Sequence, residues 1–115
     1  MNNVRFVEYN QFTIDNVIVN HMVKITLIDD TREESFWVWT ESIDYTNNSI
    51  VGIISNNLLT HKLQIGQMIT FDCINIKDVS ERFYTKEETE KSIMIAKVNN
   101  NPITKYFQSL NTRFC

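Results

Sequence analysis

Two histidines and one internal cysteine are the residues of this chain best suited to catalysis or metal binding. His21 and His61 could act as general bases or metal ligands, and Cys73 could act as a nucleophile if a nearby base formed its thiolate. Neither histidine lies in an H-E-x-x-H or C-x-x-C motif, so a zinc site would need unrelated segments. Cys73 alternates with Ile69 and Phe71, which is typical of a small core residue. We therefore expect no metal, no cofactor and no catalytic residue, with His61 in a loop.

Four carboxylates gather in a short charged segment between two β-like segments. They are Asp29, Asp30, Glu33 and Glu34. The segment lacks the D-x-D-x-D-G spacing that wraps a calcium ion, and a solvated hairpin tip explains the charges equally well. An acidic tip would also complement a basic partner and accelerate its capture. We therefore expect these four carboxylates to form the electrostatic rim of a partner-binding site.

Trp37 and Trp39 lie two residues apart in a β-rich segment, so their side chains point to one face of a strand. Phe36 and Val38 take the other face. If that other face meets the core, both indoles lie on the outside of the sheet. They are then covered either by the chain's own C-terminal helices or by another protein, since tryptophan is enriched among residues that carry interface energy. The second alternative makes Trp37 and Trp39 the predicted anchors of a partner.

Hydrophobic patterning predicts an α+β fold, mostly an antiparallel meander with one or two C-terminal helices packed on it. Several segments show the alternation or the apolar run of a strand: residues 4–14, 17–27, 36–40, 49–54 and 68–76. A break is expected near Asn20 and His21, and a strand end or bulge near Ile74. Residues 58–64 are expected to form a connector or a short helix.

The last third of the chain predicts helices. Thr85 and Glu88 fit a capping box for a helix that starts at Lys86. Residues 93–98 fit either the continuation of this helix or a strand, because so short an apolar run does not decide between them. A final amphipathic helix is expected at residues 102–110.

Size and charge limit the class of protein. The 115 residues, of which 43% are hydrophobic, fit one domain over residues 1–115. A net charge of -3, with few basic residues near the tryptophans, disfavours binding to nucleic acid or to an anionic membrane. Cys73 and Cys115 do not form a disulfide framework, and the sequence shows neither a signal peptide nor a membrane span. We therefore expect a cytoplasmic protein.

Short motifs between residues 36 and 78 form a recognisable pattern. They are Phe36-Trp37-Val38, Ile50-Val51-Gly52-Ile53, Asn56-Asn57, the run from Leu63 to Phe71, and Ile76-Lys77-Asp78. The pattern resembles a bacterial family, the domain of unknown function 2314, in which aspartate stands at the position of Gln67 and tryptophan at that of Val79. The resemblance implies a small bacterial cytoplasmic α+β domain, some of whose relatives lie beside polymorphic toxins as immunity proteins.

The residues and the resemblance together favour a non-enzymatic protein-binding module of a bacterium or phage. The expected role is that of an immunity-type inhibitor, which neutralises a toxin or a defence or phage factor by direct binding. Two alternatives stay open. One is a small ligand-binding domain or enzyme that uses Cys73 and His61, and the other is a homo-oligomeric structural subunit paired through a strand edge or through residues 102–110.

Overall fold

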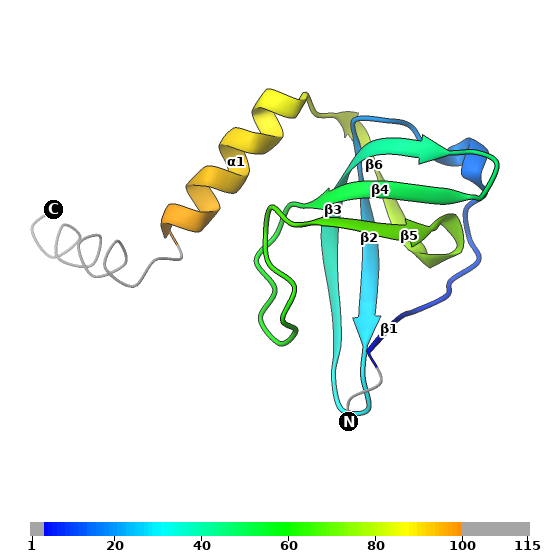
Figure 1. The fold of residues 1–115 in the computed structure, drawn as a ribbon, viewed down its shortest axis with the longest axis horizontal. Coiled ribbons are helices and arrows are strands. Elements are labelled where there is room, and N and C mark those ends of the chain that lie inside the picture. The colour runs from blue at the N-terminus through cyan, green and yellow to red at the C-terminus, as the bar shows by residue number, and fades with distance from the viewer. Residues whose placement is uncertain (1–3, 100–115) are drawn as a thin grey trace, which may run out of the picture.

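The computed structural model describes residues 4–99 of the chain (Figure 1). In this range the elements are β1 (Arg5–Phe6), η1 (Ile14–Asn16), β2 (His21–Ile28), β3 (Glu33–Asp44), β4 (Ser49–Ile54), β5 (Met68–Asp72), η2 (Cys73–Asn75), β6 (Ile76–Phe83) and α1 (Lys86–Asn99). Cys115 and the helix expected at residues 102–110 lie outside the described residues.

The strands form one antiparallel sheet in the order β1, β2, β3, β4, β5, with β6 paired to β2. β1 and β6 pair with different halves of β2, at Leu27–Ile28 and at His21–Ile25. Only the three residues of η2 separate β5 at one end of this order from β6 beside β2 at the other. The sheet must therefore curl into a half-barrel, and the α+β fold with its antiparallel meander is confirmed.

Several element boundaries differ from the patterns for local reasons. β2 begins at His21, because Asn20 takes a left-handed φ of 74° and interrupts the extended chain at the break that was expected. The phase shift at Ile74 is the η2 turn, so the strand end expected there is confirmed. Most of the strand expected at residues 4–14 is wrong, since only Arg5–Phe6 pairs with the sheet. β6 was not expected at all.

The core lies inside the curl of the sheet. Its buried residues are Val17, Val23, Ile25, Leu27, Phe36, Val38, Ile50, Ile54, Ile69, Phe71, Cys73 and Ile76. Residues 55–67, which we call the β4–β5 loop, add Leu58 and Leu63 to this cluster. The loop therefore closes one end of the half-barrel, and Figure 1 shows it beside the ribbon of β2 and β3.

Gly52 occupies a position on β4 where no larger residue fits. A Cβ there would lie 2.3 Å from Cγ1 of Val38 and 2.8 Å from the carbonyl oxygen of Trp39. We expect Gly52→Ala to lower the free energy of unfolding by about 2 kcal/mol, because overpacking forces neighbours off their rotamers. Urea denaturation followed by circular dichroism measures this loss. A variant as stable as the wild type would contradict the close approach of β3 and β4.

α1 begins with the capping box that the sequence predicts. The amide of Glu88 donates to Oγ1 of Thr85 at 3.1 Å, and the amide of Thr85 donates to Oε1 of Glu88 at 3.2 Å. The helix continues through residues 93–98, which decides between helix and strand. Thr89 and Ile93, one turn apart, are its buried residues. No helix in residues 4–99 is long and apolar enough to span a membrane.

Candidate functional site

Trp39 lies on the outer face of β3 but is covered by this chain. Trp39 is 2% exposed, and its Nε1–H donates to the carbonyl of Tyr84 at 2.8 Å. Tyr84 belongs to the short connection between β6 and α1, so the start of α1 is tied down beside the indole. The expectation that both tryptophans anchor a partner is therefore corrected: Trp39 presents no surface that a partner could reach.

Trp37 lies on the same face and stays partly exposed. The amine of Lys24, its neighbour on β2, lies 5.7 Å from the centre of an indole ring, which places a cation over the aromatic face. The backbone N–H of Trp37 donates to Oδ1 of Asn56 at 2.7 Å, and its carbonyl accepts from the amide of Ser55 at 2.9 Å. Trp37 is thus held in one place while part of it remains open to a partner.

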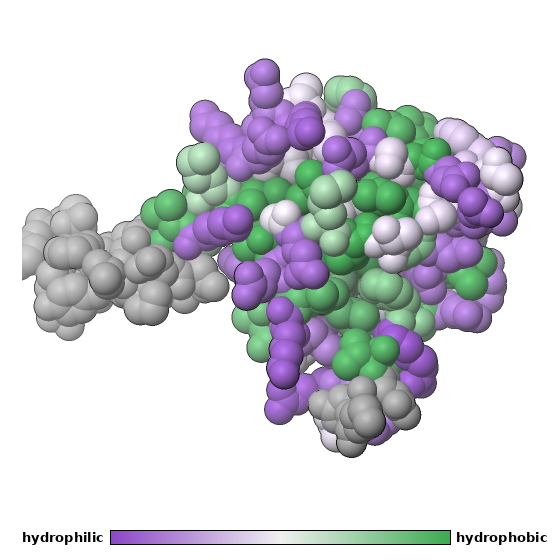
Figure 2. Space-filling view, in the orientation of Figure 1, coloured by the Kyte–Doolittle hydropathy of each residue, from purple (hydrophilic) through white to green (hydrophobic). Residues whose placement is uncertain are grey.

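Further apolar side chains lie on the outside of the sheet, towards β5 and α1. Ile53 is half-buried beside Trp39 in the pairing of β3 with β4, and Met68 opposite it on β5 is 56% exposed. On α1, Met94 is 66% exposed and borders an open hollow of about 300 Å³ together with Ile53. Figure 2 shows hydrophobic side chains over β4 and β5, with hydrophilic ones over the upper part of α1.

The four carboxylates at the β2–β3 hairpin divide into two pairs. Asp30 and Glu33 are exposed, as a solvated hairpin tip predicts. The side chains of Asp29 and Glu34 are only 7% and 12% exposed. The expectation of a four-residue acidic rim is therefore corrected, because Asp29 and Glu34 point to groups of their own chain. Asp30 and Glu33 remain available to a partner.

Glu34 ties the β4–β5 loop to the start of β3. Its carboxylate accepts from the amides of Leu59, Thr60 and His61, from the Thr60 hydroxyl at 2.7 Å and from Nδ1 of His61 at 3.0 Å. Burial by itself would raise the pKa of Glu34, but these donors outweigh burial and lower the pKa to about 2. The carboxylate is therefore ionised at neutral pH and fixes the loop through several charge-assisted hydrogen bonds.

Asp29 faces the same histidine from the hairpin turn. Its Oδ1 accepts from the amides of Thr31 and Arg32, both at 2.8 Å, and these two bonds are the main reason why the pKa of Asp29 is lowered. Its Oδ2 lies 3.4 Å from Nε2 of His61, whose side chain is 4% exposed. His61 is in a loop, as expected, but the structure also places it between two carboxylates.

This cluster does not form a metal site, because the two carboxylates meet opposite edges of the imidazole ring and do not converge on one point. Among residues 4–99, no group of three or more His, Cys, Asp or Glu side chains is arranged so that it could hold a metal ion. The sequence alone could not reveal the cluster, since 27 positions separate Glu34 from His61 and no local pattern links them.

Cys73 lies away from this cluster and does not meet His61. It is buried in the core, and its amide donates to the carbonyl of Asn48, the last residue of the turn that joins the end of β3 to β4. Glu34 lies near the start of that strand, whose 12 residues extend roughly 40 Å. Burial is the main cause that raises the pKa of the Cys73 thiol. Cys73 is thus the expected small core residue, while the expected pairing of Cys73 with His61 is corrected.

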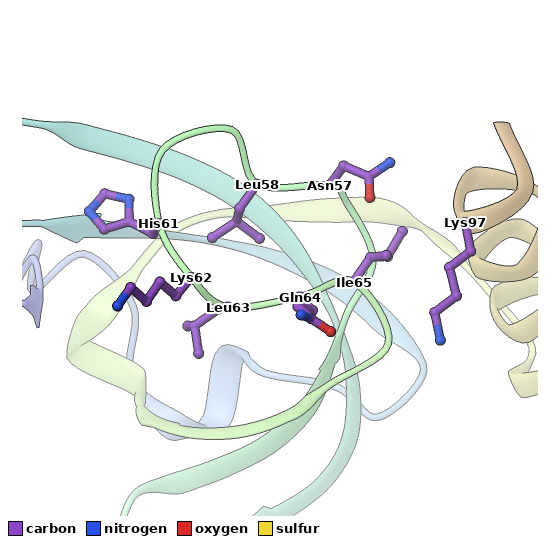
Figure 3. A pocket seen from close by; sticks show the side chains of 8 residues that line it. All are labelled: Asn57, Leu58, His61, Lys62, Leu63, Gln64, Ile65 and Lys97. Carbon is purple, nitrogen blue, oxygen red and sulfur yellow. The ribbon is translucent and has the colours of Figure 1, made fainter. Parts of the chain in front are cut away.

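The β4–β5 loop separates two open hollows of about 490 and 460 Å³. Both are lined by His61, Lys62 and Leu63. Figure 3 shows the first hollow, with the imidazole of His61 at one side and Lys97 of α1 at the other. Lys62 and Lys97 lie far apart in this view, so they do not form a single binding site for an anion.

The described residues thus offer a surface around Trp37 and a buried cluster around His61. Comparison of the chain with known proteins found no match to a family model, to a curated protein or to a solved structure.

Proposed function

We propose that this protein is a non-enzymatic binding module that holds another protein on the outer face of its sheet. The observation that carries the proposal is Trp37, a partly exposed indole fixed by Lys24 and by the two residues that follow β4. An aromatic ring held in position loses little conformational entropy when a partner covers it. Trp37 is therefore the central anchor of the proposed interface.

The surroundings of Trp37 indicate the chemistry of the partner. Glu33 lies four residues before Trp37 on β3, and side chains at even spacing share a face of the strand. Glu33 and Asp30 are exposed at the hairpin end, whereas Met68 is an exposed apolar residue near the other side of the face. The expected partner surface therefore combines an apolar pocket with neighbouring basic groups.

The class of partner that we propose is a toxin, or a defence or phage factor, which this chain neutralises by covering it. An immunity-type inhibitor acts through a complementary surface and needs no catalytic group of its own. The resemblance at residues 36–78 supports this class, and that segment extends from β3 to β6 and includes Trp37.

The test is affinity capture from the native host with tagged full-length protein, followed by mass spectrometry and measurement of the affinity for whatever is retained. We expect one stoichiometric partner, whose affinity falls at least about 30-fold with Trp37→Ala, as for a hot-spot residue. Tyr45→Ala is the matched control, because Tyr45 is an exposed aromatic residue in the turn between β3 and β4, at the far end of β3.

Charge reversal tests the acidic rim separately. Glu33→Lys should slow association and weaken the dependence of the association rate on salt. The proposal is contradicted if no protein is retained, or if Trp37→Ala and Tyr45→Ala bind the partner equally well. Light scattering on the same sample identifies self-association, which would favour the homo-oligomer alternative.

A further inference from the structure

The geometry around His61 suits a charged imidazole. Nδ1 lies 3.0 Å from Oε1 of Glu34, and Nε2 lies 3.4 Å from Oδ2 of Asp29. The ring is almost fully buried, and its Nε2 makes no hydrogen bond to any described residue. Each ring nitrogen therefore faces a carboxylate oxygen, and all three side chains are shielded from solvent.

A neutral imidazole cannot satisfy both contacts. It has one N–H donor and one lone pair, and whichever nitrogen holds the lone pair would direct it at a carboxylate. The Thr60 hydroxyl lies 3.0 Å from Nδ1 and could donate to a lone pair there only by giving up its own bond to Glu34. An imidazolium ion presents an N–H to Glu34 and another to Asp29. Lys62, the neighbour of His61, lines both hollows and Lys97 lines the first, but neither forms an ion pair with the carboxylates that face the ring. The local charges thus favour the protonated ring over either neutral tautomer.

The β4–β5 loop depends on this cluster for its position. Three consecutive amides, those of Leu59, Thr60 and His61, donate to Glu34, and Leu58 and Leu63 on either side pack on the core. If the contact between His61 and the hairpin is lost, the loop loses the ion pairs that hold the ring against Asp29 and Glu34, and its three amide bonds to Glu34 then open more often. The two hollows on either side of the loop would then open towards each other.

We propose that Asp29, His61 and Glu34 form a proton-operated latch, which holds the β4–β5 loop closed while His61 is protonated and loosens it when His61 loses its proton. The latch is a regulatory device that does not depend on the proposed partner. It acts at the end of the half-barrel that Leu58 and Leu63 close. Loosening follows a rise in pH, because the folded closed form binds one proton more than the loosened form.

The test is amide hydrogen exchange by NMR on the full-length protein at pH 5.5 and pH 8.5, with rates corrected for intrinsic exchange. The amides of Leu59, Thr60 and His61 should lose at least tenfold of their protection at the higher pH, while the amides of β2 and β3 keep theirs. His61→Gln should abolish this dependence on pH. His21→Gln is the matched control, since His21 is the chain's other histidine and bonds to the carbonyl of Ser80 instead.

Equal loop protection at both pH values in the wild type would overturn the latch, and so would a pH response that survives in His61→Gln or disappears in His21→Gln. Imidazole ¹⁵N spectra of the wild type keep the test decisive if His61→Gln does not fold. The chemical shifts of the loop amides should change over the same pH range in which the His61 ring loses its second N–H. Loop shifts that follow the His21 ring, or neither ring, would exclude the latch.

Discussion

Trp39→Ala is expected to lower the free energy of unfolding by about 4 kcal/mol, since truncation of a buried tryptophan leaves a large cavity. The indole is 2% exposed, and the carbonyl of Tyr84 would lose the Nε1–H donor that holds the start of α1. Trp37→Ala, two residues earlier on the same face, should cost less, about 2 kcal/mol, because Trp37 is only partly buried. Urea denaturation monitored by circular dichroism measures both losses.

Trp39→Phe separates the two contributions of the indole. Phenylalanine keeps most of the buried ring and removes the donor to Tyr84, so it should cost less than alanine, by an amount that reflects the retained apolar contact. Equal losses for Trp37→Ala and Trp39→Ala would show that α1 and its connection do not cover Trp39 in solution. A smaller loss for Trp37→Ala also means that weaker partner binding by this variant reports on the surface and not on unfolding.

Glu34→Ala is expected to lower the free energy of unfolding by about 3 kcal/mol. The change removes the common acceptor of three loop amides, and buried donors without an acceptor, together with a buried charge that loses a partner, are costly. Glu33→Ala is the matched control, because Glu33 is the adjacent, exposed carboxylate and should change stability by about 0.5 kcal/mol or less. Equal losses for the two variants would show that the Glu34 carboxylate does not hold the β4–β5 loop.

The contribution of Glu34 should also depend on pH. Its pKa falls from 4.5 to about 2 on folding, so the stabilisation is fully present above pH 4.5 and is lost as the pH falls towards 2. The shift corresponds to about 3 kcal/mol. The difference in stability between the wild type and Glu34→Ala should therefore shrink over this range in acid denaturation. A difference that stays constant down to pH 2 would show that the carboxylate is not held by the loop donors.

Glu34 and the proposed latch should give the β4–β5 loop opposite dependences on pH. Glu34 stabilises the fold when its carboxylate is ionised, whereas the proposed latch would hold the β4–β5 loop only while the His61 ring is protonated. The loop should therefore be most firmly held in mildly acidic solution. Hydrogen exchange at three pH values, near 3, 5.5 and 8.5, would show a maximum of loop protection at the middle value.

Features that depend on neighbours within a few residues could be predicted from the sequence. The period of two put Phe36 and Val38 on one face and both tryptophans on the other, because alternate side chains of a strand point to opposite faces. Which face meets the core stayed open until the structure placed Phe36 and Val38 there. The capping box at Thr85 and Glu88 forms as predicted, since both of its hydrogen bonds close within one helical turn. The predicted positions of the start of α1 and of the turn between β2 and β3 were correct for the same reason.

Features that depend on the curl of the sheet could not be predicted in this way. β6 has few apolar residues, and it becomes a strand because β2 offers an open edge, with Lys24 paired to Asp78. Trp39 is buried because Tyr84, 45 positions away, returns beside it. Neither contact can be detected from the hydrophobic periodicity of a short stretch of sequence.

The amino-acid sequence by itself determined the alternation of the strands, the hairpin charges and the start of the helix, because each depends on residues that are close along the chain. The tertiary structure decided which carboxylates face solvent, which tryptophan stays accessible and where His61 lies. Those outcomes follow from the closure of the half-barrel, which brings the β4–β5 loop to the β2–β3 hairpin and the connection before α1 to Trp39 on the outer face of β3.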